Sequence, residues 1–184
     1  VLEPAHGRLT GKDTGPGRLP EPDQIAELVR AVLDGADLTP DWRGRKVLIT
    51  AGGTQENLDP VRFLGNRSSG RQGFALAEIA AHRGAEVTIV VGATDDLPIP
   101  SGARIHRVTS AREMAAVVEK WAPEQDVIIM AAAVADFRPV SEAGAKMKKG
   151  QDDAALMTVE LVENPDILAT TVEQRRQGAV PADT

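Results

Sequence analysis

Apolar and polar positions along the chain follow two alternating patterns. A short apolar run without turn residues covers 47–50, further strand-like segments cover 86–91, 104–108 and 126–131, and residues 157–162 alternate between apolar and polar. We interpret these runs as strands, and the segments between them as helices because their apolar residues recur with helical spacing. Alternating helices and apolar strands predict an α/β fold, specifically a Rossmann-like, doubly wound parallel sheet covered on both faces.

Helix starts are predicted from side chains that accept hydrogen bonds from the first free backbone N–H groups. The helix expected between the third and fourth strands also has an apolar face, formed by Met114, Val117, Val118 and Trp121. We predict caps at Asp23, at Ser69 with Gln72 before a helix that opens at Gly73, at Ser110 with Glu113, and at Asn164 with Pro165 in the first helical position.

The first 40 residues differ in character from the rest. Gly and Pro punctuate residues 1–22 densely, which predicts an extended loop without helix or strand. The apolar face of the helix that follows is formed by Ile25, Leu28, Val29, Val32 and Leu33. We predict two parts, residues 1–40 from a preceding unit with its linker and residues 45–184 as a nucleotide-binding domain. We expect the sheet and the site to be completed beyond Thr184, so that this stretch alone has little activity.

Charge and composition narrow the range of functions. A net charge of −6 argues against general binding to nucleic acid or to acidic membranes. No apolar run reaches the roughly 20 residues of a membrane span. The chain has no cysteine, which excludes disulfides and thiolate sites, and His6, His82 and His106 lack ligand spacing, so we expect each at the surface. These features predict a cytoplasmic protein with no nucleic-acid or membrane partner and no metal ligands.

Two glycine- and serine-containing loops follow the first strand. Gly52 and Gly53 end that strand, and the run from Asn66 through Ser68, Ser69 and Gly70 opens directly into a helix. A helix N-terminus presents unpaired N–H groups and a partial positive charge, which suits a phosphate. We therefore predict a phosphate cradle here, against the alternative that both loops only reverse the chain.

Two later segments carry groups that suit a nucleotide. The alanine run after Met130 lets a flat base approach closely, and Asp136 can accept hydrogen bonds from a base or sugar, although a simple strand-end turn would have the same residues. Three of the four residues 146–149 are lysines, which could neutralise a triphosphate or merely face solvent. Arg62 and Arg67 could bind a carboxylate or phosphate bidentately. Because no residue stands out as a base or nucleophile, we expect catalysis by positioning and charge stabilisation.

Several multi-residue motifs, in order from about residue 46 to 168, closely resemble the bacterial phosphopantothenate–cysteine ligase, the C-terminal half of a bifunctional coenzyme A biosynthesis protein. They are Thr50-Ala-Gly-Gly-Thr, Asp59-Pro-Val-Arg-Phe, Asn66-Arg-Ser-Ser-Gly-Arg-Gln-Gly, Ala131-Ala-Ala-Val-Ala-Asp-Phe-Arg-Pro, Lys146-Met-Lys-Lys and Glu163-Asn-Pro-Asp-Ile-Leu.

The segment from Gly7 to Pro22 resembles the substrate-clamp tail of the FMN-dependent phosphopantothenoylcysteine decarboxylase that precedes the ligase. The cysteine often found in that clamp aligns with Gly11, and no flavin-binding region is present in this stretch. The resemblance therefore implies FMN only for the part of the decarboxylase that lies outside this stretch of sequence.

The resemblance implies a ligase mechanism with magnesium present. CTP activates 4′-phosphopantothenate as an acyl-cytidylate, and cysteine then attacks to form the amide. It also implies a homodimer through the ligase domain and a larger homo-oligomer in the whole protein. The implied roles are catalysis for Asn66 and Lys146, nucleotide binding for Gly52, Gly53, Ser68, Ser69, Gly70, Met130, Ala131, Ala132, Asp136, Lys146 and Lys149, and substrate binding for Arg62, Asn66 and Ala132.

Two other classes of function remain as alternatives. A nicotinamide-dependent oxidoreductase could use the same sheet, but no Gly-x-Gly-x-x-Gly follows the first strand, no acid ends 86–91, and the chain has no tyrosine. A non-catalytic nucleotide sensor would keep the cradle without a substrate site. Binding of CTP against ATP and NADPH would discriminate these alternatives.

Overall fold

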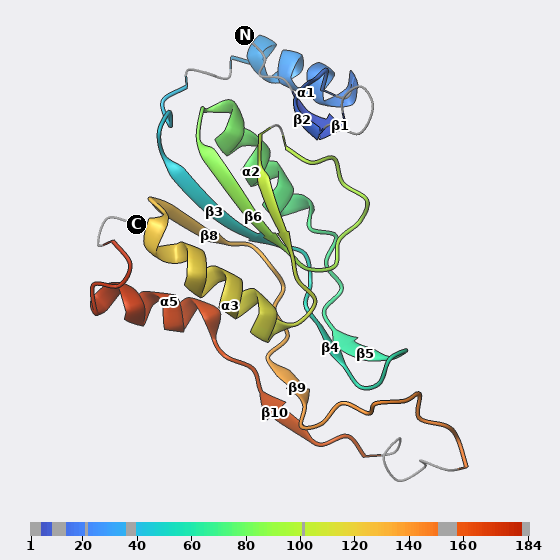
Figure 1. Ribbon diagram of the computed structural model, residues 1–184. Helices are drawn as coiled ribbons and strands as arrows, with labels where there is room; N and C mark the ends of the chain where they lie inside the picture. The colour runs from blue at the N-terminus through green and yellow to red at the C-terminus, as the bar shows by residue number, and fades with distance from the viewer. Residues whose placement is uncertain are drawn as a thin grey trace.

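The structure, a computed structural model, describes residues 5–8, 14–20, 22–35, 40–100, 102–150 and 158–181. Its centre is a four-stranded sheet in the order β7-β6-β3-β8, with every neighbouring pair parallel (Figure 1). The strands are β3 (Lys46–Ala51), β6 (Glu86–Val91), β7 (Arg104–Arg107) and β8 (Val127–Met130). The predicted parallel α/β sheet is thus confirmed, with small differences at the strand ends.

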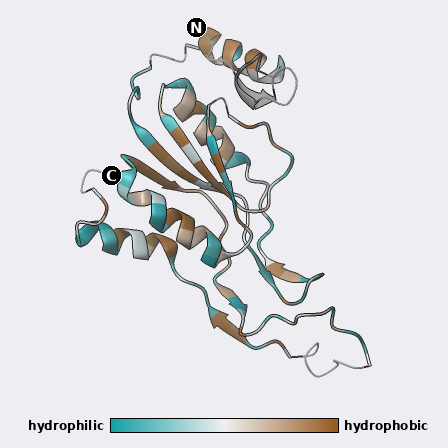
Figure 2. Ribbon diagram, in the orientation of Figure 1, coloured by the Kyte–Doolittle hydropathy of each residue, from teal (hydrophilic) through white to brown (hydrophobic). Residues whose placement is uncertain are grey.

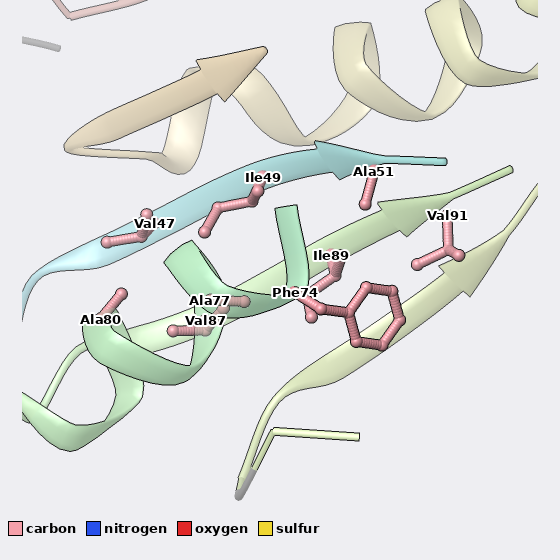
Figure 3. Close-up of a cluster of buried hydrophobic side chains, with 9 residues drawn as sticks. All are labelled: Val47, Ile49, Ala51, Phe74, Ala77, Ala80, Val87, Ile89 and Val91. Carbon is pink, nitrogen blue, oxygen red and sulfur yellow. The ribbon is translucent and has the colours of Figure 1, made fainter. Parts of the chain in front are cut away.

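Helix α2 (Arg71–His82) covers one face of the sheet. Alternate residues of β3 and β6 point toward it, because successive side chains of a strand face opposite sides. Figure 3 shows this cluster: Val47, Ile49, Ala51, Val87, Ile89 and Val91 from the strands meet Phe74, Ala77 and Ala80 from the helix.

Helices α3 (Ala111–Trp121) and α5 (Ile167–Arg176) cover the opposite face, and the short 3-10 helix η1 (Ala122–Glu124) follows α3 (Figure 1). The buried residues here are Leu48, Val90, Met114, Val118 and Ile167. Residues of β3 therefore contribute alternately to both cores, and the sheet is doubly wound as predicted. The apolar face predicted for α3 is confirmed, since Met114 and Val118 are fully buried and Val117 and Trp121 pack against them.

The capping prediction is correct for α3 and wrong for α2. Ser110 Oγ accepts from the N–H of Glu113 at 3.2 Å, and the Glu113 carboxylate accepts in return from the N–H of Thr109 at 2.7 Å. Helix α2 instead starts after Gly70, which has φ +75° and no side-chain cap. Only glycine is suited there, because a Cβ would lie 2.4 Å from Thr94 Cγ2.

Two other predicted caps are also wrong. The cap of α5 is Asp166, whose carboxylate accepts from the N–H of Ala169 at 2.8 Å, so Pro165 precedes the cap instead of opening the helix. Helix α1 (Pro22–Leu33) begins before Asp23, because Pro suits a first helical turn. Both helices nevertheless exist where the periodicity predicted them.

The loop prediction for residues 1–22 is wrong in part. Strands β1 (Ala5–Arg8) and β2 (Thr14–Arg18) pair antiparallel, with Gly7 opposite Gly15. Pairing of this kind uses backbone groups, so a segment rich in Gly can form a ribbon without an apolar pattern. Further along, helix α1 leaves part of its apolar face exposed, including Leu33.

Two short antiparallel ribbons extend from the carboxyl end of the sheet (Figure 1). One consists of β4 (Gln55–Asn57) and β5 (Phe63–Gly65), and the other of β9 (Phe137–Pro139) and β10 (Leu161–Glu163). The strand predicted at 157–162 is thus displaced to β10 and pairs outside the parallel sheet, while residue 157 lies outside the described residues. Strand β10 is apolar in Figure 2 and exposed to solvent.

The surface prediction is wrong for two histidines. His82 and His106 are half-buried, and Nδ1 of the first and Nε2 of the second are buried without a hydrogen-bond partner. Burial lowers the pKa of His82, and burial together with Arg104 and Lys120 lowers the pKa of His106. The side chain of His6 lies outside the described residues. Among the helices described, none has the length and apolar character needed to span a membrane.

Candidate nucleotide site

The loops that follow β3, β6 and β8 meet at the carboxyl end of the sheet, where open α/β sheets bind ligands. Backbone hydrogen bonds join them directly. Gly53 and Ala93 exchange two N–H···O bonds of 2.8 Å each, and the N–H of Ala133 donates to the Gly52 oxygen at 2.8 Å. The loop after β3 is therefore held between its two neighbours.

The glycines of the first loop are explained by these close approaches. A Cβ at Gly52, whose φ is +80°, would lie 2.5 Å from the Ala93 oxygen, and a Cβ at Gly53 would lie 2.6 Å from the Asn66 oxygen. The space beside each glycine is filled by the chain itself. A phosphate contact at Gly52 or Gly53 stays a prediction, and the structure gives both residues a packing role.

The hydroxyl groups of the second predicted loop accept long hydrogen bonds from backbone N–H groups two residues further along. Ser68 Oγ accepts from the N–H of Gly70 at 3.4 Å, and Ser69 Oγ accepts from the N–H of Arg71 at 3.5 Å. The N–H of Asp95 donates to the backbone carbonyl oxygen of Ser69 at 3.1 Å. These long serine bonds are weak by geometry. The phosphate cradle at Ser68, Ser69 and Gly70 therefore remains a prediction in which a phosphate would replace them.

Two threonines that the sequence analysis did not single out hold the loop of residues 131–135, which we call the alanine loop. Thr50 lies in β3, and Thr54 follows the glycine turn after this strand. The N–H of Ala132 donates to Thr50 Oγ1 at 3.1 Å, and the N–H of Ala135 donates to Thr54 Oγ1 at 2.8 Å. Both threonines are buried, so their hydroxyl groups serve this loop and not solvent. The sequence signal that could have indicated this role is the threonine at each end of the glycine turn, Thr50 and Thr54.

A pocket of about 380 Å³ lies between the alanine loop and the start of α5. Its lining combines apolar side chains from the core under α3 and α5 with a polar rim. It includes three of the predicted nucleotide residues, Met130, Ala132 and Asp136, whereas Ala131 is not part of the lining. The other lining residues are Thr50, Met114, Val134, Ala135, Phe137, Glu163, Asn164, Pro165, Asp166, Ile167 and Leu168.

Two asparagines hold the alanine loop from opposite sides. Asn66 Nδ2 donates to the Val134 oxygen at 3.1 Å, which places this exposed amide beside a pocket residue. Asn164 Nδ2 donates to the Ala135 oxygen at 2.8 Å, and its Oδ1 accepts from Arg138 at 3.2 Å. The motif beginning at Glu163 was noted in the sequence, but its position in the pocket was not predicted.

Arg62 faces an internal carboxylate. Asp59 is 1% exposed, and its Oδ1 accepts from the N–H groups of Val61 and Arg62, both at 2.8 Å. Its Oδ2 accepts from Arg62 Nε at 3.0 Å and from the N–H of Met147 at 3.2 Å. Burial acts to raise the pKa of Asp59, but these donors outweigh it and lower the pKa to about 2.

The lysine segment lies on the β4–β5 ribbon and not at the pocket. The N–H of Ala143 donates to the Leu58 oxygen at 2.9 Å, and Lys146, Lys148 and Lys149 are exposed. None of residues 140–150 lines the pocket described above, nor does Arg62 or the exposed Arg67. The structure therefore brings Asn66, Ala132 and Asp136 to one region and leaves the predicted cations outside it.

No three His, Asp or Glu side chains converge as a metal site among the residues that the structure describes. The rim carboxylates Asp136, Glu163 and Asp166 line the pocket without forming such a group.

Comparison with known proteins places this geometry in a family. Residues 42–181 match the family model described as the DNA/pantothenate metabolism flavoprotein C-terminal domain. The chain belongs to this family, which confirms the resemblance seen in the sequence motifs.

Bacterial relatives are similar over nearly the whole chain. The Coenzyme A biosynthesis bifunctional protein CoaBC of Mycobacterium tuberculosis is 53% identical over 182 residues, which is 98% of this chain and 43% of that protein. The protein of the same name from Vibrio cholerae is 45% identical over 167 residues, covering 91% of this chain and 40% of the relative. The chain thus spans about two fifths of the length of these curated relatives.

Solved structures agree on the architecture. A crystal structure of the C-terminal domain of Coenzyme A biosynthesis bifunctional protein CoaBC is 39% identical with a TM-score of 0.64, over 74% of this chain and 62% of that one. A Cab2 mutant in complex with phosphopantothenate-cysteine has a TM-score of 0.55 at 21% identity, over 84% of this chain and 68% of that one. The second likeness supports the fold alone.

Proposed function

We propose that this chain carries a CTP-dependent phosphopantothenate–cysteine ligase of coenzyme A biosynthesis. The observation that carries the proposal is the pocket at the carboxyl end of the sheet, where Ala132 and Asp136 lie in the lining and Asn66 is hydrogen-bonded at its edge. Its volume of about 380 Å³ suits a nucleoside or a similarly sized group. The family match and the CoaBC relatives support the same activity.

In this proposal the pocket binds the cytidine part of the nucleotide. The apolar side chains of Met130, Val134 and Leu168 offer a surface for a flat base, while the carboxylate of Asp136 accepts from a sugar hydroxyl or base amine. Thr50 and Thr54 hold the loop in place, which reduces the ordering cost of binding.

The proposed reaction has two balanced steps. A carboxylate oxygen of 4′-phosphopantothenate attacks the α-phosphorus of CTP, a P–O bond forms, and pyrophosphate leaves with its electron pair. The cysteine amine then attacks the acyl carbon, loses a proton, and releases CMP as the amide forms. Asn66 would orient the acyl-cytidylate, and Lys146 and Lys149 would stabilise the phosphate charge.

In this proposal magnesium is bound through the nucleotide phosphates. Among the described residues, no group of carboxylates or histidines forms a cage for it. Such partial binding through substrate phosphates is common for Mg²⁺. FMN would belong to the decarboxylase part of a bifunctional protein and has no role at this pocket.

A homodimer is part of the proposal. The two ribbons expose apolar side chains, including Val61, Phe63, Leu161 and Val162, which a second copy could cover. A larger homo-oligomer would involve regions outside the ligase part.

Equilibrium binding tests the nucleotide part of the proposal. We expect CTP to bind more tightly than ATP or NADPH, and Asp136→Ala to weaken CTP binding by roughly tenfold, the effect of losing one hydrogen bond to a charged group. Glu173→Ala is the matched control, because Glu173 pairs with Arg176 in α5 outside the pocket. Equal affinities for CTP and ATP, or no effect of Asp136→Ala, would contradict the assignment.

A further inference from the structure

The tip of the β4–β5 ribbon contacts the lysine segment at the backbone of Met147. Its N–H donates to Asp59 Oδ2 at 3.2 Å, and its carbonyl oxygen accepts from Arg62 Nη2 at 2.6 Å. Both polar backbone groups of this residue are therefore engaged by one acid–base pair. Met147 lies between Lys146 and Lys148, so the contact is made at the centre of the basic segment.

The pair that makes this contact is itself firmly held. Arg62 approaches Asp59 Oδ2 with both Nε, at 3.0 Å, and Nη2, at 2.8 Å. The side chain of Asp59 is fully buried and that of Arg62 is 39% exposed. The guanidinium therefore already donates from Nε and Nη2 to a carboxylate and a carbonyl, using N–H groups that it would otherwise offer to a substrate carboxylate.

We propose that Asp59 and Arg62 are positioning residues that hold the Lys146–Lys149 segment through the backbone of Met147. Arg62 then acts through the lysines and does not bind phosphopantothenate itself. The functional half of this inference rests on the proposed function, because it assigns the lysines to the triphosphate.

A basic segment of this kind needs an anchor. Lys146, Lys148 and Lys149 are exposed and carry like charges within four residues, and holding such a segment in one conformation costs entropy. The bond from the N–H of Ala143 to the Leu58 oxygen, at 2.9 Å, supplies a second attachment to the same ribbon tip. An anchored segment meets a polyphosphate with less ordering left to occur, which strengthens binding.

Tryptic cleavage tests the anchor without reference to catalysis, because the three lysines are themselves cleavage sites. Arg62→Lys keeps the positive charge but cannot span Asp59 and Met147 with a planar fork. We expect it, and Asp59→Asn, to raise the cleavage rate after Lys146 to Lys149 by roughly tenfold, since charged hydrogen bonds are lost.

The matched control for the cleavage assay is Asp41→Asn. Asp41 and Arg83 form another acid–base pair, in the segments that precede β3 and follow α2. This variant should leave cleavage at the three lysines unchanged. Unchanged cleavage in Arg62→Lys would overturn the proposal, as would equally faster cleavage in the control. If Asp59→Asn fails to fold, the cleavage rate of Arg62→Lys alone tests the proposal.

A double-mutant cycle with CTP tests the functional half. If Arg62 acts through Lys146, Arg62→Lys should weaken CTP binding by about tenfold in the native background and less than about twofold in Lys146→Gln, because the two changes remove one interaction. If Arg62 instead bound the substrate carboxylate, phosphopantothenate affinity would fall equally in both backgrounds, and the positioning role would be wrong.

The two experiments separate the two claims. Faster cleavage in Arg62→Lys without any CTP binding by the native chain would support the anchor and reject the proposed ligase. Normal CTP binding with unchanged cleavage would reject the anchor and leave the ligase proposal standing.

Discussion

The side-chain amide of Asn66 donates to the backbone oxygen of Val134 at 3.1 Å. This bond joins the loop that leaves β5 to the loop that leaves β8, across 68 positions of sequence. It places a side chain from the predicted phosphate loop beside the pocket that Val134 lines. Asn66 is therefore one of the residues through which the two halves of the predicted site meet.

We predict that Asn66→Asp impairs amide formation more than nucleotide binding. A carboxylate cannot donate to the Val134 oxygen and repels both that carbonyl and the phosphate of an acyl-cytidylate. CTP affinity should change by less than about threefold, while product formation should fall by about a hundredfold, the loss expected for one donor to a developing charge. Normal product formation with intact binding would disprove this role for Asn66.

The predicted effect at the lysine segment is graded. Lys146→Gln should weaken CTP binding by about 1.5–3 kcal/mol, the range for a hydrogen bond to a charged group. Lys149→Gln should have a smaller effect, because some of this exposed segment faces solvent. Titration calorimetry of each variant measures the difference. Equal and negligible effects at Lys146, Lys148 and Lys149 would indicate a simple surface loop.

Gly73 should resist substitution although it lies in a helix. Ala normally stabilises a helix by about 1 kcal/mol over Gly, but a Cβ at Gly73 would lie 2.6 Å from Ala51 Cβ and 3.1 Å from the Thr50 oxygen. Overpacking costs about 1–3 kcal/mol, so Gly73→Ala should lower the free energy of unfolding by up to about 2 kcal/mol. Urea denaturation measures this.

Gly144→Ala is the control for that experiment. A Cβ at Gly144 would have no neighbour within 4 Å, and its φ is not positive. The unfolding midpoint should therefore stay unchanged. An increase in stability for Gly73→Ala would show that α2 does not pack on β3 as closely as described.

The lowered pKa of Asp59 makes the free energy of unfolding depend on pH in the acid range. Its pKa is lowered from 3.8 to about 2 because donors around the buried carboxylate outweigh the effect of burial. With the folded-state pKa below the unfolded one, ionised Asp59 stabilises the fold above about pH 4, and this contribution is lost as the pH falls to about 2.

The measurement for Asp59 is the urea midpoint at several pH values across that window. The backbone N–H of Lys46 lowers the pKa of Asp126, and Arg83 lowers the pKa of Asp41, so the native chain loses stability in acid for several reasons. Asp59→Asn should be less stable at neutral pH and should show a shallower loss between pH 4 and 2. An unchanged slope would contradict the lowered pKa.

The sheet could be predicted from the sequence because its signal is local. The runs at 47–50 and 86–91 are mostly apolar and β-branched, as expected for parallel strands buried on both faces, and the structure places them side by side. The face of α3 and its cap at Ser110 also depend on nearby residues only. Such features do not require knowledge of distant contacts.

The errors and omissions arise from contacts between distant segments. Gly70 replaces Ser69 as the start of α2 because Thr94 packs against it, and no pattern near residue 70 reveals that neighbour. Likewise, Arg62 binds the Asp59 carboxylate and the backbone oxygen of Met147, 85 positions away, and its motif does not reveal this distant partner. Motif resemblance could identify these residues as important but could not assign them partners.

The most direct test of the central claim is pyrophosphate release from CTP in the absence of cysteine, assayed in the protein as its gene encodes it. We predict a release that requires 4′-phosphopantothenate, reaches about one equivalent per site, and becomes continuous with CMP formation once cysteine is added. ATP should not replace CTP. Absence of phosphopantothenate-dependent pyrophosphate release, despite tight CTP binding, would contradict the ligase and favour a nucleotide sensor.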